Sequence, residues 1–556
     1  MTQPWWKNSV VYQIYPKSFN DTTGNGTGDI QGVIEKLDYL DQLGVDVIWL
    51  TPIYKSPQRD NGYDISDYFD IHEEYGTMED FDRLLEQAHK RNIRIIMDIV
   101  VNHTSTEHEW FQQSIQSKDN PYRDYYIWKD PVDGAEPTNW QSKFGGNAWA
   151  YDEGTGQYYL HLFDVTQADL NWENEAVRNS VYDMMHFWLQ KGVDGFRLDV
   201  INLISKNQAF PNDYEGDGRK YYTDGPRVHE FMHEMNQEVF SKYEMMTVGE
   251  MSSTTIDNCV KYTNPEREEL DMTFSFHHLK VDYPNGEKWT VADFDFQQLK
   301  QILSEWQVGM QQGGGWNALF WCNHDQPRVV SRFGNDEEYH KESAKMLATT
   351  IHLMRGTPYI YQGEEFGMTN PKFDSIEHYR DVEALNTYKI LQEQGKDEEE
   401  ILAILGQKSR DNSRTPMQWT AGRQAGFTEN IPWIPVASNY EQVNAEAALE
   451  DETSIFYHYQ HLIQLRKQYD IMTHGEYELI LEDDDEIFAY VRHGEGEKLV
   501  VVNNFYANET TFTLPEGIDV EGFTSNVLLT NYQDTQGDVH HITLRPYESV
   551  VFHLTK

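Results

Sequence analysis

Residues 93–103, with the sequence IRIIMDIVVNH, indicate the fold of this chain. The segment is short, apolar and β-branched, as a buried parallel strand is, and it carries polar groups toward its end, among them Asp98 and His103. Residues 193–200 (VDGFRLDV), 245–250 (MMTVGE) and 318–325 (ALFWCNHD) have the same character. In a (β/α)8 barrel, the reacting groups lie at the carboxyl ends of the strands. We therefore expect one barrel mouth to gather seven side chains: Asp98, His103, Arg197, Asp199, Glu250, His324 and Asp325.

Strand-like and helix-like segments alternate along most of the chain. This alternation favours an α/β protein with a closed parallel (β/α)8 TIM barrel over an open sheet. The expected strands are residues 10–15, 45–50, 93–100, 193–200, 245–250, 270–276, 318–321 and 358–362.

Two segments do not fit a plain barrel. The connection after the third strand is too long for a simple loop and is dense in Tyr and Trp, which predicts an inserted small domain. From residue 477 the segments become short and β-rich, which predicts an antiparallel β-sandwich. We therefore divide the chain into the first part of the barrel (1–103), the inserted subdomain (104–172), the second part of the barrel (173–476) and the C-terminal β-sandwich domain (477–556).

The composition excludes some classes of partner. The chain has 45 basic and 92 acidic residues and a formal net charge of −47, which excludes nucleic acid and anionic membranes as expected partners. The simplest explanation of the acidity itself is solubility. Cys259 and Cys322 form no CxxC pattern, so neither a disulfide framework nor a zinc site is expected. The N-terminal residues do not resemble a signal peptide, and no apolar run is long enough to span a membrane, so a cytoplasmic location is expected.

Three carboxylates at different strand ends suggest glycoside hydrolysis, which needs one carboxylate to attack or to activate water and another to protonate the leaving oxygen. Glu250 is the expected acid, because neighbouring carboxylates raise a carboxyl pKa. Asp199 follows Arg197 by two residues, so both side chains leave the strand on one side, and the guanidinium should keep Asp199 ionised. Asp325 would hold sugar hydroxyls. Any one of these residues, taken singly, could be a helix cap or part of a loop salt bridge.

The motifs DIVVNH, GFRLDV, GE and NHD occur in the order typical of the α-amylase family of retaining glycoside hydrolases, which the chain resembles over essentially its full length. QADLN at residues 167–171 resembles the extra motif of the oligo-1,6-glucosidase branch, with Ala168 where that branch usually has Pro. The resemblance implies that Asp199 is the nucleophile, Glu250 the acid/base and Asp325 the transition-state stabiliser, with no cofactor for catalysis. It also implies a sugar-binding set made of Asp60, Tyr63, His103, Gln167, Arg197, His324 and Arg410. A wall formed by Asp60 and Arg410 would make the enzyme exo-acting.

The substrate is indicated by the residues 215–231, 249–255 and 274–288, which resemble the phospho-α-glucosidases of this family. The resemblance implies cleavage of the α,α-1,1 bond of trehalose 6-phosphate to glucose and glucose 6-phosphate. Because Lys and Arg are the usual ligands of phosphate, a dianion entering an acidic cleft needs local cations. The candidates are Arg219, His277, Lys280 and Lys288, although an isolated surface lysine is often merely solvated.

Residues 21–29 (DTTGNGTGD) alternate oxygen ligands in the manner of a cation loop. The twelfth position is Gly32 rather than Glu, which excludes an EF-hand, and a plain Gly-rich turn is an equal alternative to a structural Ca²⁺ or Mg²⁺ site. The candidate ligands are Asp21, Thr23, Asn25, Thr27 and Asp29.

Two other functions stay open. One is an α-1,6-glucosidase acting on neutral isomaltose-type sugars, for which an acidic rather than a basic segment at 277–288 would be expected. The other is a non-catalytic member of the family, which would lack the catalytic set and carry a membrane anchor.

Overall fold

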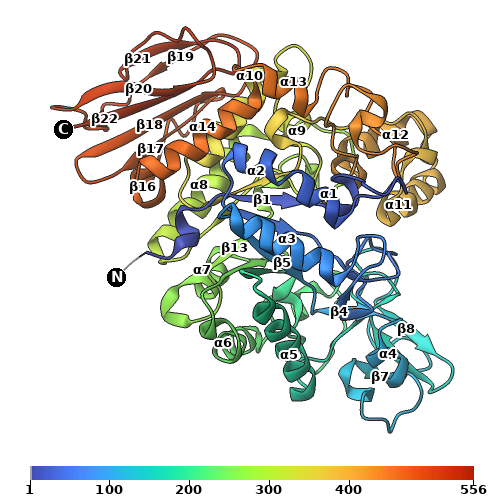
Figure 1. Ribbon diagram of the computed structural model, residues 1–556. Helices are drawn as coiled ribbons and strands as arrows, with labels where there is room; N and C mark the ends of the chain where they lie inside the picture. The colour runs from blue at the N-terminus through green and yellow to red at the C-terminus, as the bar shows by residue number, and fades with distance from the viewer. Residues whose placement is uncertain (1–2) are drawn as a thin grey trace. The chain divides into compact units, whose positions relative to one another are not determined.

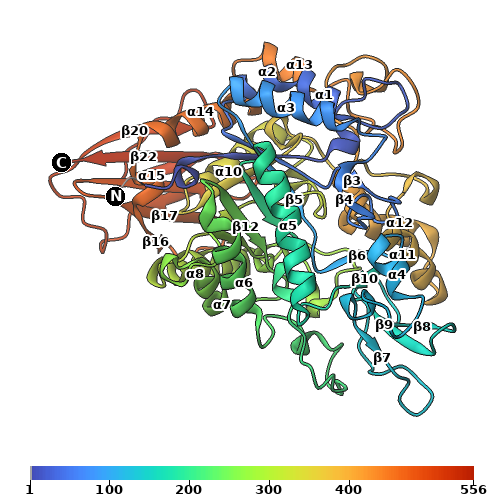
Figure 2. The ribbon, with the colours of Figure 1, turned by 60° about the horizontal axis from the view of Figure 1, so that its bottom comes forward.

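The computed structural model describes residues 3–556 (Figures 1 and 2). The chain forms two compact units. The first unit contains the residues up to Ile48 together with His277–Lys556, and the second unit contains Trp49–Phe276. Strand β2 (Val47–Leu50) spans the point where the chain passes from the first unit to the second.

The predicted (β/α)8 barrel is confirmed. Its sheet has eight strands in the order β13-β12-β11-β5-β2-β1-β15-β14. Every strand overlaps the residues predicted from the sequence. The bounds are β1 (Val11–Ile14), β2, β5 (Arg94–Ile99), β11 (Gly195–Leu198), β12 (Met246–Glu250), β13 (Met272–Phe274), β14 (Ala318–Leu319) and β15 (Thr357–Tyr361).

In the second unit, parallel pairing joins β5, β11, β12 and β13. The register places Arg197 of β11 opposite Asp98 of β5 on one side and Val248 of β12 on the other. Outside the long connection after β5, the helices of this unit lie around these strands in Figure 1. They are α3 (Met78–Lys90), α5 (Glu175–Lys191), α6 (Val228–Glu238) and α7 (Ile256–Thr263).

Helix α5 shows how the local sequence sets up the strand that follows it. The Asn174 side chain accepts a hydrogen bond from the backbone of Ala176 at the N-terminus, and Gly192 ends the helix with a left-handed φ of 108°. The buried face includes Val181 and Trp188, spaced as one apolar stripe of a helix. The chain then turns directly into β11, which carries Arg197.

The long connection after β5 begins and ends in one short antiparallel ladder. Strand β6 (His103–Ser105) pairs with β10 (Gln167–Asp169), with His103 opposite Asp169. The intervening residues form α4 (Glu109–Ser114) and a three-stranded sheet in the order β7-β9-β8 (Figure 2). The strands of that sheet are β7 (Trp128–Lys129), β8 (Trp149–Asp152) and β9 (Gln157–Leu160). Because the ladder closes the insertion, it brings two predicted sugar-binding residues, His103 and Gln167, close together.

The first unit contains β1, β14 and β15 and most of the remaining helices. The helices are α1 (Ile30–Glu35), α2 (Leu37–Leu43), α8 (Phe296–Gln312), α9 (Val329–Phe333), α10 (His340–His352), α11 (Val382–Glu393), α12 (Glu398–Lys408), α13 (Ala445–Glu450), α14 (Ile455–Gln468) and α15 (Ile471–His474). The segment between β15 and α14 holds α11, α12 and Arg410. It is therefore part of the framework of the candidate site.

The C-terminal residues form the predicted antiparallel sandwich. A five-stranded sheet in the order β16-β17-β18-β22-β20 packs with the two-stranded sheet β19-β21 through a shared apolar core that includes Val491, Phe512 and Phe552. Figure 1 shows these strands in red. The bounds are β16 (Glu476–Ile480), β17 (Ile487–His493), β18 (Glu497–Asn504), β19 (Thr510–Thr513), β20 (Thr524–Thr530), β21 (His541–Leu544) and β22 (Ser549–Thr555). The domain boundaries that we assigned from the sequence remain a prediction.

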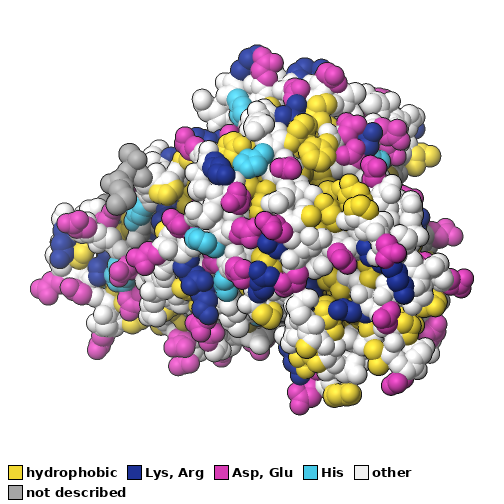
Figure 3. All heavy atoms as spheres, turned by 90° about the horizontal axis from the view of Figure 1, so that it is seen from below, with side chains coloured by type: hydrophobic (Ala, Val, Ile, Leu, Met, Phe, Trp, Pro, Cys, Tyr) yellow, Lys and Arg dark blue, Asp and Glu magenta, His cyan; other side chains and the backbone are white. Residues whose placement is uncertain are grey.

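On the face drawn in Figure 3, Asp and Glu side chains are scattered, with Lys and Arg side chains between them. Among residues 3–556, no helix combines the length and the apolar character that crossing a bilayer would need.

Candidate active site

A single guanidinium, that of Arg197, binds three carboxylates in the second unit. Its Nη1 lies 3.0 Å from Asp98 Oδ1 and 2.6 Å from Asp199 Oδ1, and its Nη2 lies 2.7 Å from Glu250 Oε2. Only 1% of the Arg197 side chain is exposed. Asp98 lies on β5, Arg197 on β11 and Glu250 on β12, and Asp199 directly follows β11. Parallel pairing of these strands in register brings the four side chains together. Since one buried cation faces three buried anions, removing Arg197 would leave uncompensated charge.

Two of the carboxylates around Arg197, those of Asp98 and Asp199, have raised pKa values. Burial and the charge of Glu250 raise the pKa of Asp98 to about 6, although Arg197 and the Tyr63 hydroxyl oppose the shift. Burial and Glu250 also raise the pKa of Asp199 well above its usual range, against the lowering effect of Arg197. The lowering of the Asp199 pKa that was expected from the Arg197 guanidinium is therefore outweighed by burial and by Glu250. The two carboxylates nearest Arg197 Nη1 and Nη2, Asp199 and Glu250, thus lie at the ends of neighbouring strands on one guanidinium.

The backbone after Asp199 is strained. Val200 has φ 36° and ψ 39°, in the left-handed region that β-branched residues avoid. The Val200 N–H donates to Glu250 Oε2 at 3.1 Å. The unusual conformation thus aims a donor at the carboxylate of Glu250, and strain of this kind is typical of functional sites.

Four predicted sugar-binding residues lie together in the second unit. The Tyr63 hydroxyl donates to Asp98 Oδ2 at 2.8 Å, and Gln167 Nε2 donates to Asp60 Oδ2 at 2.9 Å. His103 Nε2 donates to the Tyr63 carbonyl at 3.0 Å. Burial lowers the pKa of His103 to about 4, so the ring is neutral near pH 7.

The sequence did not indicate a role for Lys206, which is buried and contacts residues close to His103 and Gln167 in the sequence. Its Nζ lies 2.9 Å from Asp169 Oδ2 and donates to Asn102 Oδ1 at 2.8 Å, and 1% of its side chain is exposed. Lys206 thus joins Asn102, which precedes His103, to Asp169, which lies two residues after Gln167. The only signal in the sequence was a lysine at the end of the apolar run VINLISK.

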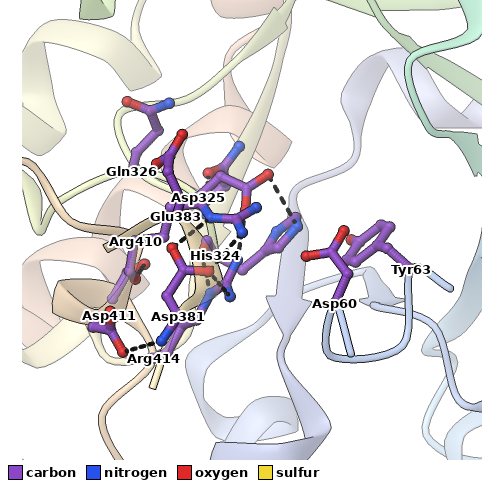
Figure 4. A network of polar contacts seen from close by, with 12 residues as sticks. Asp60, Tyr63, His324, Asp325, Gln326, Asp381, Glu383, Arg410, Asp411 and Arg414 are labelled. Atoms are coloured by element: carbon purple, nitrogen blue, oxygen red, sulfur yellow. Dashed lines mark hydrogen bonds and ion pairs between the residues drawn. The ribbon is translucent and has the colours of Figure 1, made fainter. Parts of the chain in front are cut away.

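Asp325 and His324 lie in the first unit, within a second polar network (Figure 4). Asp325 Oδ1 lies 2.7 Å from Arg414 Nη2 and 3.5 Å from Arg410 Nη1. Gln13 of β1 donates to His324 Nδ1 at 2.7 Å. Arg410 was predicted from the motif RDNSRTP, whereas Arg414, four residues later in the same motif, was missed. The wall formed by Asp60 and Arg410 remains a prediction.

The four phosphate candidates have different surroundings. Lys288 Nζ lies 2.6 Å from Glu383 Oε1, and the His277 ring stacks on Trp306 at 5.4 Å. Lys280 is exposed. Arg219 binds Asp217 at 2.7 Å, and its Nη1 donates to Ser253 Oγ at 3.4 Å. Because Ser253 follows Glu250 by three residues, the structure places Arg219 beside the segment that leaves β12.

The proposed cation loop is held together by its own hydrogen bonds. Asp21 Oδ1 accepts from the backbone N–H groups of Thr23 and Gly24, and Asp21 Oδ2 accepts from the Gly26 N–H and the Thr428 hydroxyl. Asp29 accepts from the backbone of Thr22 and Gly32. Within residues 3–556, no group of three or more His, Cys, Asp and Glu side chains is arranged to hold a metal ion. The cation site and the plain Gly-rich turn both remain predictions.

The barrel and its buried carboxylates are those of a glycoside hydrolase. Residues 13–475 match the family model for the α-amylase catalytic domain, and residues 487–551 match the model for the C-terminal domain of the α-amylase SusG. The chain belongs to the α-amylase family.

Several relatives align over the whole chain. The trehalose-6-phosphate hydrolase of Bacillus subtilis (strain 168) is 69% identical over 554 residues, covering 100% of this chain and 99% of the relative. The oligo-1,6-glucosidase of Parageobacillus thermoglucosidasius is 55% identical, with 99% of each chain covered. The crystal structure of Bacillus licheniformis trehalose-6-phosphate hydrolase has a TM-score of 0.97 and 68% identity and covers 100% of both chains.

Proposed function

We propose that this protein is a retaining, exo-acting glycoside hydrolase that cleaves trehalose 6-phosphate into glucose and glucose 6-phosphate. The cluster of Asp98, Asp199 and Glu250 on the Arg197 guanidinium is the observation that carries the reaction type. It brings two carboxylates, those of Asp199 and Glu250, to the ends of neighbouring strands, and a double displacement needs two carboxylates. The substrate is supported by the 69% identity to a trehalose-6-phosphate hydrolase, against 55% to an oligo-1,6-glucosidase.

In this proposal, Asp199 attacks the anomeric carbon of the unphosphorylated glucose. Glu250 acts as the general acid and gives a proton to the bridging oxygen, so that glucose 6-phosphate leaves and a glycosyl ester forms on Asp199. Water then attacks the ester while Glu250 takes the proton of the water, and glucose leaves with the α configuration. Asp325, which follows β14, stabilises the positive charge that develops on the sugar ring.

We further propose that Arg219 is the principal phosphate ligand. Arg219 is half-exposed, with a side-chain exposure of 51%, and it contacts the segment that follows Glu250. Lys288 is already paired with Glu383, and the His277 ring is engaged with Trp306. A phosphate dianion can replace the Asp217 carboxylate on the guanidinium, because both anions present a pair of oxygens that suits bidentate binding by arginine.

The experiment that tests the proposal compares trehalose 6-phosphate, trehalose and isomaltose in parallel assays. We expect kcat/KM to be highest for trehalose 6-phosphate, with α-glucose as the first product seen by NMR. If isomaltose is the best substrate, the protein is an α-1,6-glucosidase. If β-glucose appears first, the assignment of Asp199 as nucleophile is wrong.

Two finer predictions belong to the same proposal. Because a sugar phosphate is charged and does not cross a bilayer unaided, we place the enzyme in the cytoplasm. A weak structural cation at Asp21 and Asp29 would be revealed if EDTA lowered the melting temperature and Ca²⁺ or Mg²⁺ restored it. An unchanged melting temperature would leave the hydrogen-bonded turn as the full account of this loop.

A further inference from the structure

Asp381 lies at the centre of the polar network that surrounds Asp325 (Figure 4). Arg410 grips its carboxylate with two hydrogen bonds, from Nε to Oδ2 at 2.9 Å and from Nη2 to Oδ1 at 2.6 Å. Arg414 Nη1 lies 3.7 Å from the same Oδ1. The two arginines that contact Asp325 therefore both also contact the Asp381 carboxylate.

The side chain of Asp381 is buried, with 1% of its surface exposed, whereas 29% of the Asp325 side chain is exposed. The Asp381 backbone N–H is also fixed, since it donates to Asp411 Oδ1 at 3.1 Å. Although burial alone would raise the pKa of Asp381, the charges of Arg410 and Arg414 hold it below its usual range. Asp381 is thus a buried anion held between two cations.

We infer that Asp381 is a positioning residue for Asp325 and acts through Arg410 and Arg414. Arg410 and Arg414 repel one another, and each has Asp325 as an alternative partner. Asp381 neutralises their repulsion and fixes the fork of Arg410 in a bidentate geometry. With Asp381 in place, both arginines approach Asp325 from the side of its Oδ1. The other carboxylate oxygen, Oδ2, therefore keeps a fixed orientation.

The inference rests on the proposed function, because it assigns a purpose to the orientation of Asp325. Without the Asp381 charge, we expect both guanidinium groups to turn toward Asp325 and its carboxylate to lose its set position. A misplacement of about 1 Å in a catalytic group can cost about 100-fold in rate. The loss should fall mainly on kcat, because transition-state stabilisation is affected more than ground-state binding.

The test is the variant Asp381→Asn, with Asp282→Asn as the matched control. Asp282 is also a buried carboxylate that holds two cations, Arg332 at 2.8 Å and Lys408 at 3.0 Å. Both variants should lower the melting temperature. Only Asp381→Asn should lower kcat, by about 100-fold, with KM changed by less than about threefold.

A double-mutant cycle identifies the route of the effect. Asp325→Asn and the double variant Asp325→Asn/Asp381→Asn should have the same residual kcat, because Asp381 then has nothing left to position. Equal fold losses in the wild-type and Asp325→Asn backgrounds would overturn the inference, and so would a kcat within twofold of wild type for Asp381→Asn.

A third variant covers the case in which Asp381→Asn does not fold. Asp381→Glu keeps the charge but moves the carboxylate, so it should fold and lose part of kcat, and an unchanged kcat would contradict the inference. All variants should also be assayed on a nitrophenyl α-glucoside. If wild type cleaves this glucoside but not trehalose 6-phosphate, the substrate proposal fails while the inference about Asp381 is still tested.

Discussion

At the scale of single residues, Arg197 and Asp381 have related tasks in different units. Arg197 is a buried cation that gathers three carboxylates, and Asp381 is a buried anion that gathers two guanidinium groups. Breaking a buried pair on one side is costly because it leaves the partner charge uncompensated. Each therefore links the chemistry of its site to the stability of its surroundings.

Glu250→Gln keeps the shape of the side chain but cannot donate a proton. We expect activity on trehalose 6-phosphate to fall by at least about 100-fold, within the usual contribution of general acid catalysis. A nitrophenyl glucoside has a better leaving group and needs less protonation. Its glycosylation rate, measured in the pre-steady state, should therefore fall much less. Equal losses in this step for the two substrates would contradict the role of Glu250 as acid.

Arg219→Ala should raise KM for trehalose 6-phosphate by roughly 10–150-fold, because a charge-assisted hydrogen bond contributes about 1.5–3 kcal/mol. Kinetics on a nitrophenyl glucoside should barely change, since this substrate has no phosphate. Lys220→Ala is the control, because Lys220 is the next residue but pairs with Asp213 at 3.1 Å. A similar rise in KM in both variants would point to a general effect of charge and not to a phosphate ligand.

At the scale of elements, the stability of a helix can depend on pH when a histidine caps its N-terminus. Helix α4, in the insertion, starts at His108, whose Nδ1 accepts a hydrogen bond from the Trp110 N–H at 3.0 Å. Burial lowers the pKa of His108 to about 3. Nδ1 can accept this hydrogen bond only when the imidazole ring is neutral, because protonation of Nδ1 turns it into a donor.

His108 should make the protein less stable in acid. Its pKa is about 6.5 in the unfolded chain, so below that pH the unfolded state binds a proton that the folded state does not. Stability is lost as pH falls from 6.5, by about 2 kcal/mol at pH 5. Asn is a good N-cap and does not titrate. The melting temperature of His108→Asn should therefore fall less than that of wild type between pH 7 and pH 5.

His89 supplies a control of the opposite sign. Its Nε2 lies 2.7 Å from Asp194 Oδ2, and this contact raises its pKa. The contribution of His89 to stability is present at low pH and is lost as pH rises through the raised pKa. His89→Asn should therefore fall further below wild type in melting temperature at pH 5 than at pH 8. A parallel response of the His108 and His89 variants would show that the two shifts are misassigned.

At the scale of the whole molecule, the net charge of −47 opposes the approach of a phosphate dianion. This long-range repulsion is largely screened at an ionic strength of 0.1 M, where the Debye length is about 10 Å. What remains is the local attraction of the cations that bind the phosphate. Above this ionic strength, added salt mainly weakens that attraction.

Raising NaCl from 0.1 to 0.5 M should therefore increase KM for trehalose 6-phosphate severalfold. KM for a nitrophenyl glucoside should stay nearly constant, because it carries no charge. Steady-state kinetics at the two salt concentrations provide the measurement. An equal response of both substrates would indicate that salt acts on the enzyme as a whole and not on a phosphate contact.

Much of the fold, and the placement of carboxylates at the carboxyl ends of the strands, could be predicted from the sequence because both follow from local patterns. A buried parallel strand needs a short apolar run, and its carboxyl end must carry any reacting group, so MMTVGE predicts both β12 and the place of Glu250. The long connection after β5 and the β-rich C-terminal residues are also visible as breaks in the alternating pattern. These features can be predicted from neighbouring residues alone, without knowing which distant segments contact one another in the fold.

Tertiary structure alone decided which charges are paired and how strongly they are buried. Lys288 looked free for phosphate in the sequence, but it meets Glu383, which lies 95 residues further along the chain. Arg197 was expected to keep Asp199 ionised, but burial and Glu250 raise the pKa of Asp199. Asp381 stood in no motif, and the local sequence around Arg414 and Lys206 did not indicate which charges they meet. The free energy of a charge depends on its solvent exposure and on its neighbours in space, and neither is a property of the adjacent residues in the sequence.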